Sequence, residues 1–322
     1  DIPMGPIDGV VSPLDRERRL FAVLNPRSGI GSALYLKNEI LAGLRGLHVE
    51  HVVLRKSDDI LDIVRGAIEA GANEIVAVGG DGTVSGVAEA VAGTDAAMGI
   101  VPTGTANMVA RELRLPLSIA SSTRTIRARR GVVRMDAMSS GGRSFIYQVA
   151  VGVGADVNRR VAKPEKELLG RSSYLLGMLR ALSDMRPLMV RCRIDGREVE
   201  MLVNQLLIAN AGILGTAPLR LGPGIRPDDG KVEVVVLSGQ GRLDLIGSTM
   251  DMVLGNYGGP GLRYFDARRE VVLDTEPPAV VKADGEFVGR TPLTVQVRPG
   301  AVKVIAPAAG APRSRQWPLL PW

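Results

Sequence analysis

Three short loops in the first third of the chain carry residue types that can bind phosphate. The most informative comprises Gly79, Gly80, Asp81, Gly82 and Thr83, between an apolar run (75–78) and a helical pattern (84–92). Glycines let the backbone adopt a positive φ and approach a ligand closely, and amides at a helix N-terminus point towards an anion. We expect Asp81 to hold a cation or a ribose hydroxyl, or to orient the loop. A tight turn without a ligand is the alternative.

The other two loops repeat this arrangement of strand, loop and helix. One has the sequence NPRSG (25–29), and the other has the sequence PTGTAN (102–107). Arg27 and Ser28 add a cation and a hydroxyl donor that suit phosphate oxygens. Three such loops would gather at the carboxyl edge of one parallel sheet, which is where open α/β sheets bind ligands.

These loops resemble the diacylglycerol kinase, sphingosine kinase and bacterial lipid kinase family. The resemblance rests on NPRSG, GGDGTVSGVAEAV (79–91) and PTGTANMVARELRLP (102–116), and it continues through VAVGVGAD (149–156), RPDDGK (226–231) and KADGE (282–286). It covers residues from about 19 to about 306. GGDGT alone is less specific, because NAD kinases and phosphofructokinases carry related loops.

The resemblance implies an enzyme that uses ATP and Mg²⁺ to phosphorylate the hydroxyl of a lipid alcohol, such as diacylglycerol, a ceramide or a sphingoid base. Segment 152–156 would line the cleft near the lipid. The nucleotide would be bound by the residues of the three loops, namely Asn25, Pro26, Arg27, Ser28, Gly29, Gly79, Gly80, Asp81, Gly82, Thr83, Val84, Ser85, Thr105 and Asn107.

Catalysis is assigned by the resemblance to a carboxylate pair near the C-terminus. Glu286 would accept the proton of the attacking hydroxyl, with Asp284 as its partner, and Asp81 would assist in the nucleotide loop. Such a base contributes roughly 10²- to 10⁴-fold to a rate. Asp-Gly is also an ordinary hairpin turn, which is the alternative.

A structural Mg²⁺ is implied at Asp229, together with the main-chain carbonyls of Arg226 and Lys231. Oxygen ligands in a turn suit a hard cation. A plain type I turn over 227–230 accounts for the composition equally well.

One residue departs from the family pattern. Met108 follows Asn107, where many members carry an aspartate. If that aspartate helps to place the catalytic Mg²⁺, then Asp81, Asp136 or water must do so here.

The amino-acid composition limits the classes of partner that the protein is expected to bind. The formal charge of +6 and pI of about 9.7 favour anionic partners, but aromatic residues make up 3% of the chain and do not interleave with the basic clusters. This argues against nucleic acid and for an anionic membrane surface. We expect a cytoplasmic protein, peripheral at the inner face of the membrane, with a homodimer left open. Trp317 and Trp322 would anchor the C-terminus at the membrane interface. The alternative is a tail that is mobile or packed on the first domain.

The fold is expected to be α/β plus all-β. Apolar runs and helical patterns alternate over 19–130, which predicts a three-layer α/β nucleotide-binding domain over 1–133. The segment 134–293 changes to alternating patterns and predicts an antiparallel β-sandwich for the lipid substrate, with single strands over 145–151 and 199–209. Helical patterns near 166–184 and 243–254 predict helical inserts in this domain. By the resemblance, 294–322 return to the first domain.

Two other classes of function remain. The chain could be an NAD kinase-like enzyme with a soluble substrate, although NPRSG and PTGTAN fit lipid kinases better. It could also be a non-catalytic, lipid-binding relative, an idea encouraged only by Met108.

Overall fold

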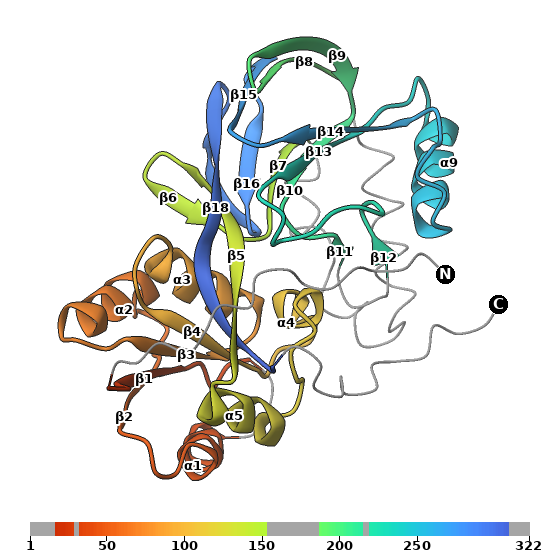
Figure 1. Cartoon of the computed structure of the whole chain (residues 1–322). Coiled ribbons are helices and arrows are strands. Elements are labelled where there is room, and N and C mark those ends of the chain that lie inside the picture. Colours follow the sequence, from red (N-terminus) through yellow and green to blue (C-terminus); the bar gives the residue numbers. More distant parts are fainter. Residues whose placement is uncertain (1–16, 29–31, 153–186, 215–218, 309–322) are drawn as a thin grey trace. The chain divides into compact units, whose positions relative to one another are not determined.

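The computed structural model describes residues 17–28, 32–152, 187–214 and 219–308 (Figure 1). The chain forms two compact units. The first comprises the residues up to Asp136 and those from Pro299 onward, and the second runs from Ala137 to Arg298. Strands β5 (Gly131–Ser140) and β18 (Leu293–Ala306) each contribute residues to both units. The sequence-based boundaries at 133/134 and 293/294 fall a few residues earlier.

The first unit is built on a parallel sheet. Its strands, in spatial order, are β2 (Val49–Val53), β1 (Leu20–Leu24), β3 (Glu74–Gly79) and β4 (Ala97–Pro102). The last part of β18 continues the sheet beside β4, with Lys303 opposite Ala97. Every residue of β3 and β4 is buried, as expected for parallel strands that are covered on both faces.

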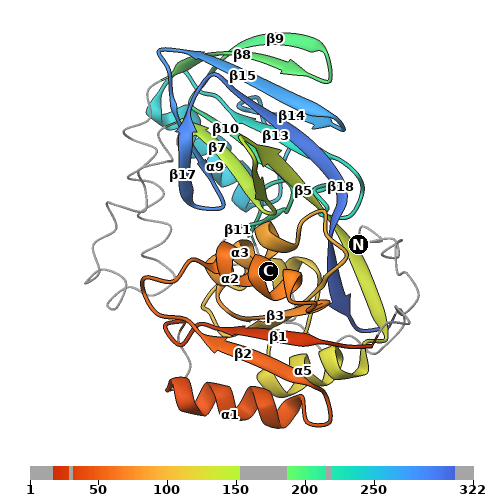
Figure 2. The same ribbon diagram turned by 90° about the vertical axis from the view of Figure 1, so that its left-hand side faces the viewer.

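Helices cover both faces of this sheet. They are α1 (Ala33–Gly43), α2 (Ile60–Glu69), α3 (Asp81–Val91), α4 (Met108–Glu112) and α5 (Ile119–Ala128). Helices α1 and α5 lie on one face, and α2 and α3 lie on the other (Figure 2). Leu36, Ile40 and Ile126 of α1 and α5 pack on Val76 and Val78 of β3. The predicted three-layer α/β fold is confirmed.

Helix α3 begins earlier than the predicted Val84. Gly80 is its N-cap, and the carbonyl of Gly80 accepts hydrogen bonds from the N–H groups of Thr83 and Val84, each at 3.0 Å. The glycine-rich run is therefore partly the first turn of the helix.

The second unit contains two antiparallel sheets. One has six strands in the order β14 (Leu262–Ala267), β13 (Val232–Leu237), β10 (Gln205–Ala209), β7 (Gln148–Gly152), β16 (Val280–Ala283) and β17 (Glu286–Arg290). The other pairs β9 (Arg197–Val203), β8 (Leu188–Ile194), β15 (Glu270–Glu276) and the first part of β18. The end of β5 forms a hairpin with β6 (Arg143–Phe145), and the unit also contains β11 (Ile213–Leu214), β12 (Leu219–Arg220) and α9 (Arg242–Val253).

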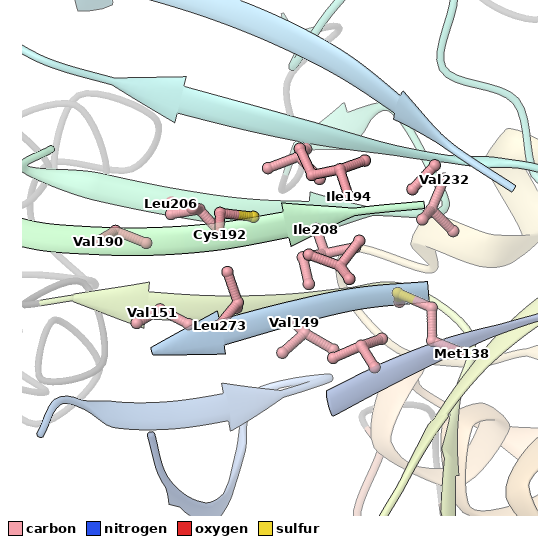
Figure 3. Close-up of a cluster of buried hydrophobic side chains, with 14 of the residues drawn as sticks. Met138, Val149, Val151, Val190, Cys192, Ile194, Leu206, Ile208, Val232 and Leu273 are labelled. Carbon is pink, nitrogen blue, oxygen red and sulfur yellow. The ribbon is translucent and has the colours of Figure 1, made fainter. Parts of the chain in front are cut away.

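The core of this unit lies between the two sheets. Val149 and Ile208 from one sheet pack with Val190, Cys192 and Leu273 from the other (Figure 3). Burial raises the pKa of the Cys192 thiol to about 11, so this residue acts as a small apolar side chain. The predicted β-sandwich is confirmed.

Two of the predicted strands are wrong in extent. The run 199–209 is split at Asn204 into β9 and β10, which belong to different sheets. At this crossing the N–H of Asn204 donates to the carbonyl of Leu237, and its side-chain oxygen accepts from the N–H of Gly239 at 2.9 Å. The run 145–151 is likewise divided between β6 and β7. The helical pattern expected near 166–184 lies outside the described residues.

A buried ion-pair network lies at the amino edge of the parallel sheet. The side chain of Glu74, the first residue of β3, is fully buried, 2.6 Å from Nη2 of Arg18 and 2.7 Å from Nη1 of Arg129. Arg18 also donates to the carbonyls of Ile126 and Arg127, at the end of α5. The network therefore links β3 to α5 and to the start of the described chain.

We expect Glu74→Gln to lower the free energy of unfolding by about 3 kcal/mol, because two guanidinium groups lose their counter-charge. Urea unfolding measures this. The control is Glu69→Gln, which removes an exposed carboxylate and should change stability by less than about 0.5 kcal/mol. Equal midpoints for the two variants would contradict a stabilising network.

Candidate functional site

Hydrogen bonds tie the three loops of the first unit together at the carboxyl edge of its sheet. Nδ2 of Asn25, after β1, donates to Oγ1 of Thr83 at 2.9 Å. The hydroxyls of Ser28 and Thr103 lie 2.9 Å apart, which joins the first loop to the third. The gathering expected from the sequence is therefore present. Thr103 is 2% exposed and was not singled out in the sequence, because its role depends on a partner 75 residues away.

Asp81 connects the second loop to the third. Its Oδ2 accepts from the N–H of Asn107 at 3.0 Å, and its Oδ1 accepts from the N–H of Met108 at 2.6 Å. Burial raises the pKa of Asp81, although these two N–H groups and the charge of Arg111 act in the opposite direction. Among the roles expected for Asp81, the geometry favours orienting the loop.

Asn107 and Gly104 form the tight turn of the third loop. Asn107 has a φ of 50°, its Oδ1 accepts from the N–H of Gly104 at 3.0 Å, and its Nδ2 donates to the carbonyl of Gly104 at 2.7 Å. A Cβ on Gly104 would lie 2.6 Å from Cα of Gly80. The fold itself thus requires a glycine at 104.

The three glycines of the second loop do not share one structural reason for being glycine. A Cβ on Gly79 would collide with the side chain of Thr83, so packing explains this glycine. The nearest atom to a Cβ on Gly80 would be 3.4 Å away, and a Cβ on Gly82 would have nothing within 4 Å. None of the three has the positive φ that we expected, and the φ of Gly80 is −89°. Neither packing nor backbone conformation accounts for Gly80 and Gly82.

The remaining nucleotide-binding predictions fall into three groups. Arg27 and Thr105 are exposed at the loop surface, and Nη2 of Arg27 donates to the carbonyl of Arg55 at 3.3 Å. Ser85 and Pro26 are half-buried, whereas Val84 is 4% exposed and packs in the core. Gly29 lies outside the described residues.

Asp136 cannot serve the three loops. Its Oδ1 accepts from the N–H of Gly300 at 2.7 Å, and Gly300 precedes Lys303, which is opposite the first residue of β4. Since β18 and β4 are parallel, Gly300 lies towards the amino edge of the sheet, opposite the loops. The suggestion that Asp136 replaces the missing aspartate at 108 is wrong.

In the second unit, Asp284 and Gly285 form the turn between β16 and β17. Both have a positive φ, 50° and 90°. The carboxylate of Asp284 accepts hydrogen bonds from three successive backbone N–H groups, those of Ile146, Tyr147 and Gln148, at 2.9–3.0 Å. Asp284 therefore anchors the segment between β6 and β7.

Asp195 and Gly196 form a second turn with the same construction. They join β8 to β9, with φ values of 49° and 91°. The carboxylate of Asp195 accepts from the N–H groups of Arg268, Arg269 and Glu270 at 2.7–3.0 Å. Burial opposes ionisation of Asp195, but these three donors outweigh it and hold its pKa below the usual range. Because the two turns are built in the same way, the aspartate of each turn has a structural role.

Glu286 follows the Asp284 turn and is open to solvent. Its side chain is 71% exposed, and its Oε2 lies 3.3 Å from Nη2 of Arg143. The guanidinium of Arg143 stands over the ring of Phe145, 5.7 Å from the ring centroid. Of the two predicted catalytic carboxylates, Glu286 is the one that a substrate can approach.

The predicted metal segment lies beside buried carboxylates. Arg226 pairs with Asp228, and Nζ of Lys231 lies 2.9 Å from Oε1 of Glu233 and 3.0 Å from Oδ1 of Asp266. Burial raises the pKa of Glu233 to about 7 against the opposing effect of Lys231, and the charges of Asp229 and Asp266 act in the same direction as burial. Burial lowers the pKa of Lys231, but the hydrogen bonds to Glu233 and Asp266 raise it overall. Carboxylates therefore outnumber basic side chains around Asp229.

No group of three or more His, Cys, Asp or Glu side chains in the described part of the chain is arranged to hold a metal ion. A site at Asp229 would depend on main-chain carbonyls, as the resemblance implies.

Met108, which departs from the family pattern, supplies Asp81 with a backbone N–H. This contact therefore does not depend on the side chain of residue 108.

Comparison with known proteins identifies the family. Residues 19–140 match the diacylglycerol kinase catalytic domain, and residues 147–306 match the YegS C-terminal NAD kinase beta sandwich-like domain. A Pseudomonas aeruginosa protein named "Probable lipid kinase YegS-like" is 32% identical over 81% of this chain and 85% of its own length. The chain belongs to the diacylglycerol kinase and YegS-like lipid kinase family.

A diacylglycerol kinase of Mycobacterium tuberculosis is 29% identical over 91% of this chain and 96% of its own length. The crystal structure of a diacylglycerol kinase from Bacillus anthracis has the same fold, with a TM-score of 0.74, 22% identity and coverage of 93% of this chain and 100% of that one. The family names describe lipid kinases, which are phosphotransferases. None of the described helices is long and apolar enough to span a bilayer.

We expect Asp284→Asn and Asp195→Asn to destabilise the protein similarly, each by about 1–3 kcal/mol, because both remove a charged acceptor from three backbone N–H groups. The loss for Asp195→Asn should vanish in acid: its folded pKa is lowered, so its stabilisation is complete above the ordinary value of 3.8 and is lost as the pH falls through the folded pKa. Thermal unfolding at several pH values measures both. An unchanged melting temperature for Asp284→Asn would contradict the role of this carboxylate as an anchor.

Proposed function

We propose that this protein is an ATP-dependent lipid kinase that transfers the γ-phosphoryl group to the hydroxyl of a lipid alcohol. The observation that carries the proposal is the set of three interlocked loops, in which Gly80 and Gly82 have neither a packing nor a conformational reason to be glycine. A ligand that approaches the backbone closely is the remaining reason. The named kinases among its relatives support the choice of ATP and of a lipid acceptor.

The phosphates of ATP would bind at the start of α3. The first backbone N–H groups of a helix have no partner within it and attract anions. Gly80, the N-cap, makes no side-chain cap, and its carbonyl already accepts from the N–H groups of Thr83 and Val84, so the N–H groups of Asp81 and Gly82 would be the ones to bind phosphate. Ser28, Arg27 and Thr105 would add hydroxyl and guanidinium donors from the neighbouring loops.

Magnesium would serve this chain in two places. The cluster of carboxylates at Asp229, Glu233 and Asp266 would suit a divalent cation held by Asp229 and the carbonyls of Arg226 and Lys231. At the reaction centre Mg²⁺ would offset the charge of the triphosphate. Both oxygens of Asp81 already accept backbone hydrogen bonds, so Asp81 would act there by holding the loops.

Glu286 would take the proton from the attacking hydroxyl. It is exposed, and Asp284 holds the turn from which it projects. Arg143, which contacts Glu286, would orient its carboxylate. Diacylglycerol, a ceramide or a sphingoid base would each supply a suitable hydroxyl, and the enzyme would meet such a lipid at the inner face of an anionic membrane.

We expect Gly82→Ala to weaken ATP binding by about tenfold or more while raising stability by up to about 1 kcal/mol, because alanine favours a helix but adds a methyl group where phosphate must approach. Calorimetry with ATP and thermal unfolding measure the two effects.

The matched control for this variant is Gly66→Ala in α2, where a Cβ also has nothing within 4 Å. It should raise stability by a similar amount and leave ATP affinity unchanged. If Gly82→Ala binds ATP as tightly as the Gly66 variant does, the second loop is only a turn.

We expect Glu286→Gln to reduce phosphoryl transfer to lipid by about 10²-fold or more, with ATP affinity within a few-fold of the parent, since glutamine cannot accept the proton. Radiolabel transfer to a mixed lipid extract, followed by mass spectrometry of the products, measures turnover and identifies the acceptor. Glu276→Gln is the control, because Glu276 is also an exposed glutamate near an arginine, 3.9 Å from Arg191. If the Glu286→Gln variant kept more than about a tenth of parental turnover, Glu286 would not be the base.

A further inference from the structure

The second unit has a hollow that its family assignment does not explain. It has a volume of about 400 Å³ and is lined by residues of the β5–β6 hairpin and of the first part of β18. Hydrogen-bond donors dominate its lining, and no carboxylate takes part. They are Ser139, Ser140, Arg143, Ser144, Thr294 and Arg298.

On β18 the sandwich fold turns the lining side chains away from the core. Along β18, Val295 and Val297 are buried between the sheets, whereas Thr294 and Arg298 alternate with them and are exposed. Alternate residues of a strand point to opposite faces, so the polar residues of β18 share the outward face. Their donors are accessible to a ligand from solvent.

The charge of the hollow is positive. Arg298 has no carboxylate partner among the residues that the structure describes. Arg143 lies 3.3 Å from the exposed carboxylate of Glu286, so its charge is shared with that residue. Guanidinium groups combined with hydroxyls match the oxygens of a phosphate in charge and geometry.

A neighbouring hollow has different chemistry. It has a volume of about 610 Å³, shares Gln296 with the first, and is lined by Arg268 and Arg269 but also by Asp195 and Glu270. Nη2 of Arg269 donates to the carbonyl of Asp195 at 3.0 Å. The carboxylates and this internal hydrogen bond reduce its attraction for anions, which singles out the first hollow.

We propose that the hollow between the β5–β6 hairpin and β18 binds a phosphate group, carried either by an anionic phospholipid headgroup or by a soluble phosphate compound. The site is separate from the nucleotide loops, which belong to the first unit. The proposal does not rest on the kinase reaction, because its test measures binding.

The test compares the parent, Arg298→Gln and Arg65→Gln. Arg65 is an exposed arginine of α2 in the first unit, so its variant removes the same charge outside the hollow. Each full-length protein is mixed with inorganic phosphate, with glycerol 3-phosphate, with phosphatidylcholine vesicles, and with the same vesicles containing phosphatidylglycerol. Calorimetry and vesicle sedimentation give affinity, and hydrogen–deuterium exchange of peptides over 137–145 and 293–299 gives the location.

In the parent, at least one phosphate probe should slow exchange in both peptides, and Arg298→Gln should bind that probe about tenfold more weakly, while Arg65→Gln matches the parent. Protection by the soluble probes would identify a site for soluble phosphate compounds. Protection by the phosphatidylglycerol vesicles alone would identify a headgroup site. Unchanged exchange in both peptides with every probe, or equal affinity of the two variants, would overturn the proposal.

Discussion

The carboxylate of Asp81 holds the second and third loops of the first unit together. Partial burial of a carboxylate is costly unless hydrogen bonds compensate it, and here two successive N–H groups at the start of α4 do so. This contact sets the third loop against the second and brings Gly104 against Gly80. Because the donor at 108 is a backbone N–H, methionine serves there without loss of the contact.

The sequence predicted those parts of the structure that depend on local pattern. The apolar runs became β1, β3 and β4, and both Asp-Gly pairs became turns with positive φ. Parts that depend on distant partners could not be predicted. The strand over 199–209 looks continuous, and its division at Asn204 is supported by hydrogen bonds to Leu237 and Gly239, more than 30 residues away. The ion pairs of Glu74 are equally non-local.

For the site, the motifs predicted which loops meet but not which atoms are already engaged. Gly79 and Gly104 look equivalent to Gly80 and Gly82 in the sequence, yet their glycines are required by packing within the fold. Of these four glycines, only Gly80 and Gly82 leave space for a ligand. Arg143 was not singled out because its neighbour Glu286 is 143 residues away. A motif gives only the types of residue present. The structure shows which of these residues are engaged in building the site and which could still contact a ligand.

The sequence Asp284-Gly285-Glu286 illustrates this separation within three residues. Three backbone N–H groups donate to the carboxylate oxygens of Asp284, so a proton taken there would remove the charge that strengthens the hydrogen bonds of the turn. Gly285 supplies the positive φ that the turn needs, without the strain of a Cβ. Glu286 is exposed, and its carboxylate can accept a proton without loss of the anchor. The same turn at Asp195 is followed by Arg197 instead of a carboxylate, so anchoring by the aspartate does not require a glutamate beside it. Glu286 is therefore an addition to a structural turn, and a reaction that needs a base provides a reason for it.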